Sequence, residues 1–243
     1  MAPVFYELEA DGLEQFAGVP TTLNRMLMAG ELDVAPISSI EYARNADRLR
    51  LLPRLCVSTE GAVDSIQLIT RKPLDQVRSV AITPESATSV VLTRVLLGEV
   101  ELVPLGQPAD ATMLIGDAAL HSAFDDPTPH YDLGRLWQER TGLPMVYAVW
   151  ACREGIEEGL EELERAHLRS LAVSRSEPEA LARRASAEYG WPAGFLARYF
   201  EKLRYHFGPR ERQGLVRFFE LAHLAGELDE VPELRFVDME RVV

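Results

Sequence analysis

The chain has 243 residues, of which 47% are hydrophobic and 26% are charged, as in a globular protein with a sizeable core. Its formal net charge of −13, without a basic run, argues against nucleic-acid binding, which needs clustered lysine and arginine to neutralise phosphates. No apolar run approaches the ~18 residues of a membrane span, and no signal peptide opens the sequence. We therefore predict a cytoplasmic monomer or dimer without nucleic-acid or membrane partners.

Short apolar or alternating stretches predict strands at 32–37, 49–53, 55–58, 65–70, 79–82, 100–103, 111–115 and 145–151. Between them, helices are predicted at 23–28, 40–46, 90–97 and from 118, with an amphipathic segment at 131–141. From residue 155 on, apolar residues at three- and four-residue spacing predict helices at 157–172, 177–189, 192–206 and 209–224. The pattern indicates an α/β fold with a helical C-terminal region.

The segment Arg71–Asp75 contains Pro73 and breaks the strand pattern, so we interpret it as a crossover between two lobes. The long apolar strand at 145–151 is interpreted as the return. This organisation predicts a first lobe made of residues 1–72 and 152–243, and a second lobe made of residues 73–151.

Three predicted strands end in small, hydroxyl or acidic residues that begin a helix. These residues are Ser38 and Ser39, then Ser86, Thr88 and Ser89, then Gly116 and Asp117. Free N–H groups and the helix dipole at such ends favour anions, and ligands of open α/β sheets bind at the carboxyl ends of strands. We expect a pocket for a small anionic molecule, although each junction taken alone is also explained as a helix cap.

Other features carry less chemistry. Cys56 and Cys152 lie in apolar stretches without metal-binding spacing, which is typical of buried thiols in a reducing compartment. His121 and His130 lie near the third junction and are either acid/base groups or surface histidines. The aromatic residues at helical spacing are predicted to pack in the core; they are Tyr199, Phe200, Tyr205, Phe207, Phe218 and Phe219. No metal-ligand spacing, glycine-rich phosphate loop or nicotinamide motif is present, so we expect no metal and no cofactor.

Six stretches, in order over nearly the whole chain, resemble one family. They read LDVAPISSIEYARNAD, EGAVDSIQLIT, ITPESATSVVL, LIGDAAL, DLGRLWQERTGLPMVYAVWA and YFEKLRYHFGP. They are similar to the MqnA family, the chorismate dehydratases of the futalosine pathway of menaquinone biosynthesis. The resemblance implies a fold of the periplasmic-binding-protein type II, in which two α/β lobes hold the substrate in a cleft. It also implies loss of water from chorismate to give 3-[(1-carboxyvinyl)oxy]benzoate.

The resemblance also assigns roles to residues. Ser65 matches the family serine that faces substrate beside the hinge. Ser38 and Ser39 match the polar turn of the first lobe, and the hydroxyl turn at 86–89 matches the anion turn of the second lobe. Because chorismate has two carboxylates, two facing helix N-termini suit it. The ring becomes aromatic, so the enzyme mainly orients the substrate and excludes water, and a substrate carboxylate can take the proton.

Two departures and two alternatives accompany this resemblance. The family begins with a strand and a Y-x-N-x-x-P-like motif whose Asn is a catalytic candidate, and Met1–Tyr6 aligns just after that Asn. We therefore expect a misassigned start. The stretch Leu105–Ala111 is shorter than a helical insert in the family.

The sister MqnD family, which acts on cyclic dehypoxanthine futalosine, has a catalytic His where this chain has Gly116, which favours the dehydratase. A non-catalytic solute-binding protein of the same fold is the other alternative.

Overall fold

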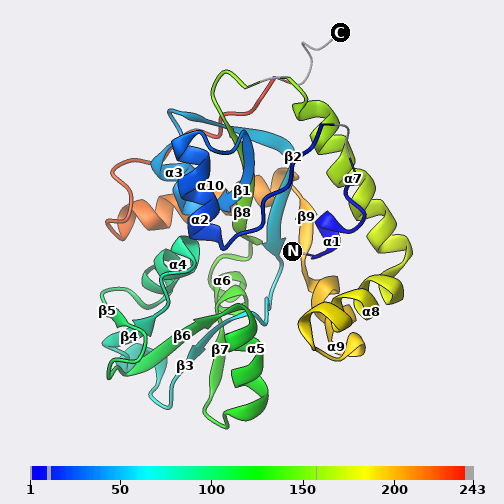
Figure 1. Cartoon of the computed structure of the whole chain (residues 1–243). Helices are drawn as coiled ribbons and strands as arrows, with labels where there is room; N and C mark the ends of the chain where they lie inside the picture. Colours follow the sequence, from blue (N-terminus) through cyan, green and yellow to red (C-terminus); the bar gives the residue numbers. More distant parts are fainter. Residues whose placement is uncertain (1, 10–11, 157, 239–243) are drawn as a thin grey trace.

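A computed structural model of the chain describes residues 2–9, 12–156 and 158–238. Two β-sheets form its centre, and helices surround them (Figure 1). Met1, expected to be a misassigned start, and Glu157, where a helix was expected to begin, lie outside the described residues.

The first sheet has the strand order β1-β8-β2-β9, with antiparallel neighbours. Its strands are β1 (Val34–Ser38), β2 (Leu49–Thr59), β8 (Met145–Arg153) and β9 (Arg204–His206). The register of β2 against β8 shifts between Leu51 and Cys56. Pro53 lies within this shift and has no N–H to donate, which explains why the sequence suggested two short strands where one bulged strand runs.

The second sheet has the order β5-β4-β6-β3-β7. Its strands are β3 (Ile66–Ile69), β4 (Ser79–Ile82), β5 (Glu101–Pro104), β6 (Ala111–Ile115) and β7 (His130–Asp132). Strand β4 is parallel to both β5 and β6, whereas β3 is antiparallel to β6 and β7.

Two strands lie in a different sheet from the one expected. All four residues of β3 are buried, and this strand pairs with β6 and β7 in the second sheet rather than belonging to the first lobe. Strand β8 pairs with β1 and β2 in the first sheet. The segment Arg71–Asp75, expected to be a crossover, contains the start of a short 3₁₀ turn at Leu74–Gln76 and connects β3 to β4, which lie in the same sheet. We therefore propose crossovers at 60–65 and 142–144.

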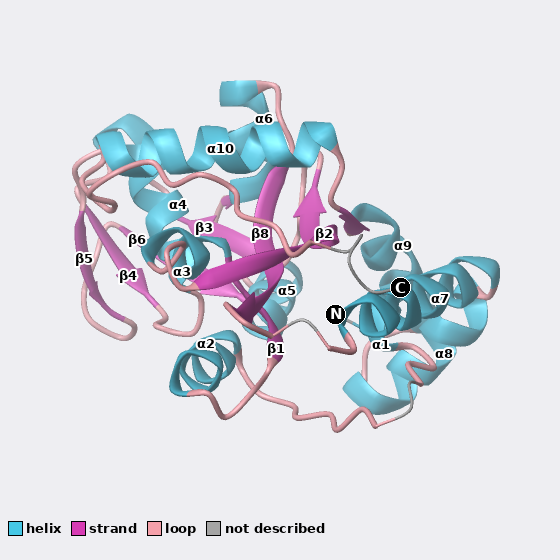
Figure 2. Ribbon diagram, turned by 90° about the horizontal axis from the view of Figure 1, so that it is seen from above, coloured by secondary structure: helices cyan, strands magenta, loops and turns pink. Residues whose placement is uncertain are grey.

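The helices are α1 (Ala2–Phe5), α2 (Pro20–Ala29), α3 (Ser39–Arg44), α4 (Ala87–Leu97), α5 (Gly116–Asp125), α6 (Leu133–Thr141), α7 (Leu160–Ser176), α8 (Pro178–Tyr189), α9 (Ala193–Lys202) and α10 (Pro209–Leu224). Figure 2 shows α10 along one face of the first sheet and groups α1 with α7 and α8. The helix expected at 192–206 ends at Lys202, because residues 204–206 pair with β2 instead.

One apolar cluster joins the two sheets. It includes Ile37 and Val149 from the first sheet and Leu68 and Met113 from the second, each at most 1% exposed. Cys56 and Cys152 are buried free thiols, as predicted, and removal from water raises the pKa of Cys152 to about 11. Among the described residues, no helix combines the length and apolarity needed to cross a bilayer, and no cluster of His, Cys, Asp or Glu has the makings of a metal site.

Candidate functional site

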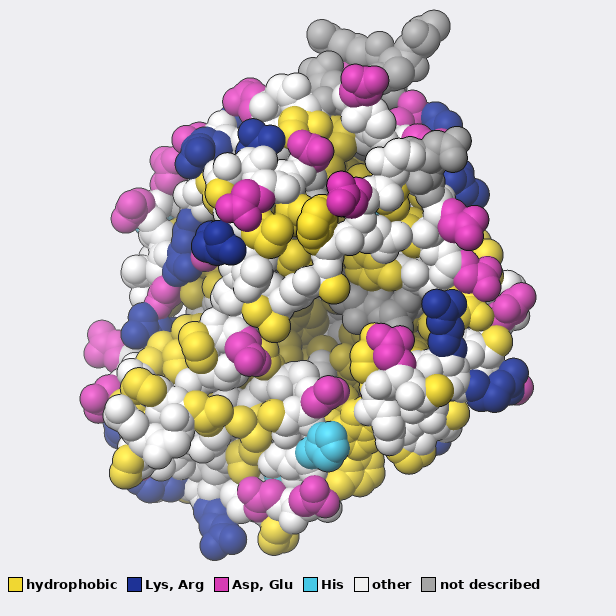
Figure 3. Space-filling model, in the orientation of Figure 1, with side chains coloured by type: hydrophobic (Ala, Val, Ile, Leu, Met, Phe, Trp, Pro, Cys, Tyr) yellow, Lys and Arg dark blue, Asp and Glu magenta, His cyan; other side chains and the backbone are white. Residues whose placement is uncertain are grey.

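The molecule is hollowed between the parts that hold the two sheets (Figure 3). Because β4 and β6 are parallel neighbours, the helices that follow them, α4 and α5, begin at the same edge of the second sheet. The antiparallel strand β3 begins at this edge too, so Ser65 lies beside Gly116, whose N–H donates to the Ser65 carbonyl oxygen at 2.8 Å. The topology thus gathers Ser65 and two of the three predicted junctions.

The first junction reaches the same place from the other sheet. The backbone N–H of Ile40, in the first turn of α3, donates to Thr88 Oγ1 in the first turn of α4, with an N–O distance of 3.4 Å. The N-termini of α3 and α4 therefore face each other. We call the hydroxyl residues at these two ends the helix-terminus cluster; they are Ser38, Ser39, Ser86, Thr88 and Ser89.

Most hydroxyls of the helix-terminus cluster already have protein partners. Ser39 Oγ donates to the Val146 carbonyl oxygen on β8 at 2.7 Å. Ser86 Oγ accepts the Ser89 N–H at 3.3 Å and lies 2.9 Å from Ser89 Oγ, so Ser86 caps α4. Ser38, the residue before α3, makes no such cap with its side chain. The capping interpretation therefore holds for α4 but not for α3.

A second group consists of Ser65, of Tyr199, which contacts it, and of two tyrosines whose pKa the charge of Tyr199 would raise. Tyr199 Oη, from α9, donates to Ser65 Oγ at 2.9 Å. Tyr147 Oη, from β8, lies 3.1 Å from Thr59 Oγ1. Tyr205, on β9, is 2% exposed, and its hydroxyl has no hydrogen-bond partner in the described part of the chain. We call Ser65, Tyr147, Tyr199 and Tyr205 the Ser65–tyrosine cluster.

The tyrosines of this cluster are neutral at physiological pH. Removal from water raises the pKa of Tyr147, Tyr199 and Tyr205 above the ordinary tyrosine value. Tyr199 is also close enough to the other two that its negative charge would raise the pKa of both. A neutral phenol donates a hydrogen bond but is a poor base. The cluster is therefore suited to hold and polarise oxygen atoms.

The loop that carries the serine is held by one carboxylate. Asp132 accepts the N–H groups of Val63 at 3.1 Å and Asp64 at 2.7 Å, and the side-chain amide of Gln67 at 3.0 Å. It also caps α6 by accepting the Arg135 N–H at 3.0 Å. Asp64 adopts a left-handed backbone conformation, with φ at 61°. Because charge-assisted bonds of this kind are strong, the loop before β3 has a fixed geometry.

The third junction contributes space and a charge. Gly116 has a φ of 57°, and a Cβ added there would meet no atom within 4 Å. Asp117 is exposed in the first turn of α5, and its charge contributes to raising the pKa of Tyr199. The two nearby histidines make local contacts: His121 Nδ1 lies 2.9 Å from the Asp117 carbonyl oxygen, and His130 Nε2 lies 3.0 Å from Ser122 Oγ.

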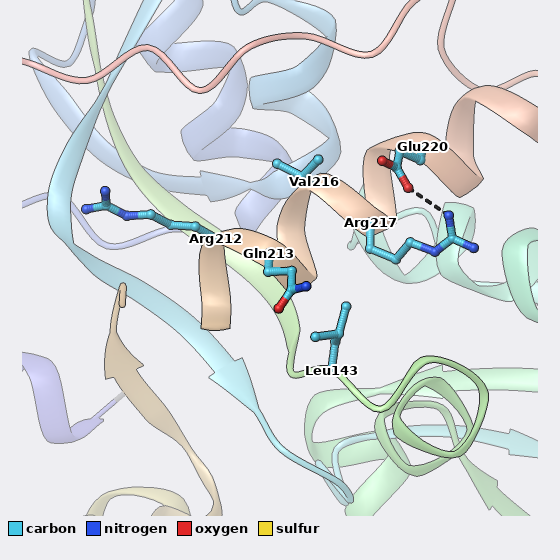
Figure 4. A pocket seen from close by; sticks show the side chains of 6 residues that line it. All are labelled: Leu143, Arg212, Gln213, Val216, Arg217 and Glu220. Atoms are coloured by element: carbon cyan, nitrogen blue, oxygen red, sulfur yellow. Dashed lines mark hydrogen bonds and ion pairs between the residues drawn. The ribbon is translucent and has the colours of Figure 1, made fainter. Parts of the chain in front are cut away.

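A separate pocket of about 380 Å³ lies on the outer face of α10 (Figure 4). Its lining residues are Leu143, Arg212, Gln213, Val216, Arg217 and Glu220. Arg217 forms an ion pair with Glu220 at 2.7 Å, and Arg212 donates to the Pro53 carbonyl oxygen at 2.8 Å. Because both cations already have protein partners, this pocket offers less chemistry than the hollow between the sheets.

The tyrosines near Ser65 leave no signal in the sequence pattern. Tyr205 packs in the core, as predicted, and its hydroxyl has no partner in the described part of the chain. Tyr199 was expected to serve only as core packing, but it also hydrogen-bonds to Ser65. Tyr147 lay within a strand predicted only from its apolar character. Helical or strand spacing shows which face of an element is apolar, but not which residue a hydroxyl on that face contacts in the folded protein.

The chain is similar to several known proteins. The model of a protein family described as menaquinone biosynthesis matches residues 1–224. A chorismate dehydratase from Thermus thermophilus is 34% identical over 252 residues, which cover 90% of this chain and 90% of that protein. A 1,4-dihydroxy-6-naphtoate synthase from the same organism is 25% identical over 236 residues, covering 89% of this chain and 85% of that protein.

Among solved structures, the periplasmic aliphatic sulphonate binding protein SsuA from Escherichia coli has a TM-score of 0.65 at 13% identity. The match covers 94% of this chain and 82% of that one. At this identity the likeness concerns the fold alone, and it confirms the expected periplasmic-binding-protein type of architecture with two α/β lobes.

Proposed function

The chain belongs to the menaquinone biosynthesis family, and on that premise we propose that it is a chorismate dehydratase, a hydro-lyase that converts chorismate to 3-[(1-carboxyvinyl)oxy]benzoate. The observation that carries this choice within the family is the higher identity to the dehydratase than to the naphtoate synthase of the same organism. Gly116 supports it, because the sister MqnD family, by resemblance, has a catalytic His at this position.

The substrate has two carboxylates, a hydroxyl and an enolpyruvyl ether on a cyclohexadiene ring. We assign one carboxylate to the N-terminus of α4, where Ser86, Thr88 and Ser89 lie. Ser38 and Ser39 shape the facing turn, and the ring lies beside Ser65. The open space at Gly116 accommodates the substrate, and Asp117 lies at its edge.

The elimination removes the hydrogen from the carbon that bears the ether and the hydroxyl from the adjacent carbon. The carbon–hydrogen bond supplies the electrons of the new double bond, the carbon–oxygen bond breaks, and hydroxide with one proton leaves as water. The tyrosines are too weakly acidic to act as bases at neutral pH. A carboxylate of the substrate takes the ring proton and passes it to the departing hydroxide, while the site orients the ring and hydrogen-bonds the developing charge.

The decisive experiment incubates the purified chain with chorismate and follows the aromatic product by absorbance and mass spectrometry. We expect turnover, and we expect Ser65→Ala to lower kcat/KM about a hundredfold, as loss of a donor to developing charge does. Ser176→Ala, at the exposed end of α7, is the matched control and should leave kcat/KM unchanged.

Other results would favour the rival functions. Binding of chorismate in calorimetry without turnover would indicate a solute-binding protein. Turnover of cyclic dehypoxanthine futalosine, with chorismate unchanged, would indicate an MqnD-type lyase. Full activity of Ser65→Ala would remove the role assigned to that serine.

A further inference from the structure

Each polar group of Ser65 has a protein partner, but the hydroxyl keeps capacity for more. Its N–H donates to the Val63 carbonyl oxygen at 2.7 Å, and its carbonyl oxygen accepts the Gly116 N–H at 2.8 Å. Its hydroxyl oxygen accepts a hydrogen bond from Tyr199 at 2.9 Å. A serine hydroxyl has one proton and two lone pairs. What remains for a ligand is the hydroxyl proton and one lone pair.

The direction of the Tyr199–Ser65 bond decides what the serine can do. Tyr199 is the donor, and because its pKa is raised, chiefly by burial, the phenol keeps its proton at neutral pH. With Tyr199 as donor, the proton of Ser65 must point away from the tyrosine. We propose that Tyr199 is a positioning residue that holds Ser65 as a hydrogen-bond donor to the substrate oxygen that gains negative charge as the hydroxyl leaves. This inference rests on the proposed function.

The ring of Tyr199 is fixed by stacked aromatic side chains. It lies parallel to the ring of Phe195, with an interplanar angle of 3° and centroids 6.4 Å apart. Phe195 contacts Trp191 at 5.0 Å and Phe124 of α5 at 5.4 Å, between ring centroids. These contacts connect α9 to a helix of the second lobe. The phenol therefore reaches Ser65 from a rigid support.

A second contact ties the same helix to the serine loop. Lys202, the last residue of α9, forms an ion pair with Asp64, the residue before Ser65. Together with the Tyr199 hydroxyl, this pair fixes the end of α9 against the loop that Asp132 organises. The arrangement predicts that the donor direction of Ser65 depends on α9, far away in the sequence.

A double-mutant cycle tests the proposal, because a residue that acts through another loses its effect when the other is removed. We measure kcat and KM for chorismate in the wild-type chain, Tyr199→Phe, Ser65→Ala and the double variant. Tyr199→Phe keeps the stacked ring and should lower kcat about tenfold with KM nearly unchanged. In the Ser65→Ala background the same change should have no further effect. Tyr189→Phe, a half-exposed phenol at the end of α8, is the matched control and should match the wild type.

Three outcomes would overturn the proposal. They are wild-type kcat in Tyr199→Phe, an equal loss in both backgrounds, or a loss confined to KM. Far-ultraviolet circular dichroism and thermal unfolding verify that the variants fold; if Tyr199→Phe does not, Phe195→Leu replaces it in the cycle, since it displaces the same phenol. No turnover by the wild-type chain would overturn the proposed function together with this inference, whereas turnover with additive losses would overturn the inference alone.

Discussion

The helix-terminus cluster and the Ser65–tyrosine cluster differ in how many of their hydroxyls already hydrogen-bond to other protein groups. In the helix-terminus cluster, Ser39 binds a carbonyl oxygen of β8, Ser86 caps α4, and Thr88 accepts an N–H of α3. In the Ser65–tyrosine cluster, the proton of Ser65 and the hydroxyl of Tyr205 have no partner in the described part of the chain.

This difference indicates that the two clusters have different roles toward a ligand. A ligand at the helix-terminus cluster exchanges one hydrogen bond for another, so its net gain is small. A ligand that reaches Ser65 meets a hydroxyl proton that no described group accepts, whereas the Tyr205 hydroxyl stays buried among apolar side chains. We therefore expect the first cluster to position the substrate and the second to act on it. Four substitutions test this contrast, from the largest expected effect to the smallest.

Asp132→Ala should break the support of the Ser65–tyrosine cluster. It leaves the buried N–H groups of Val63 and Asp64 without an acceptor and removes the cap of α6, so we expect a loss of about 3 kcal/mol in the free energy of unfolding. Urea titration measures it. Asp132→Asn keeps one acceptor oxygen and should lose about half as much; equal stability of Asp132→Ala and the wild type would refute the assigned role.

Gly134→Ala tests how closely α6 approaches the same cluster. A Cβ at this position would lie 2.5 Å from both the Gly61 carbonyl oxygen and Tyr147 Oη. Alanine normally stabilises a helix relative to glycine by about 1 kcal/mol, but here we expect a destabilisation of about 2 kcal/mol from overpacking.

The matched control is Gly194→Ala in α9, where the nearest atom to an added Cβ is Arg198 Nη1, at 3.9 Å. This variant should be as stable as the wild type or slightly more so. If both variants are more stable than the wild type in thermal unfolding, α6 does not approach Gly61 and Tyr147 as closely as described.

Thr88→Val tests whether the helix-terminus cluster binds the substrate or takes part in the reaction. Valine keeps the shape of threonine but cannot accept the Ile40 N–H, so we expect a loss of about 1 kcal/mol in stability and a roughly tenfold rise in KM for chorismate, with kcat unchanged. Thr93→Val, whose hydroxyl donates only within α4, should leave KM unchanged. If Thr88→Val instead lowers kcat at constant KM, the helix-terminus cluster takes part in the reaction itself.

Tyr205→Phe should have the smallest effect on the ligand-free protein. Because the hydroxyl is buried without a partner, its removal should leave stability unchanged or raise it by up to about 1 kcal/mol. Tyr42→Phe is the contrast: its hydroxyl donates to the Glu233 carbonyl oxygen and accepts the Arg235 N–H, so we expect a loss of about 1–2 kcal/mol. Equal losses in chemical denaturation would mean that Tyr205 has a partner after all.

The sequence by itself determined most of the elements and where they end. Strands β4 and β6 and helix α10 occupy the residues that periodicity predicted, because alternating or helical spacing of apolar side chains records which face is buried. The strand-to-helix junctions at Ser38–Ser39 and Gly116–Asp117 were visible for the same reason. Cytoplasmic localisation and a monomeric or dimeric state stay predictions.

Tertiary structure alone decided which strands pair and which hydroxyls remain unpaired. Local periodicity does not identify the partner of a strand. Strand β3, expected in the first lobe, pairs with β6, and β9, expected as the end of a helix, pairs with β2. The partners of Ser39, Ser65 and Thr88 come from distant parts of the chain. A hydroxyl's chemical role depends on which of its hydrogen bonds the fold has already filled, and that is settled only when those distant segments meet.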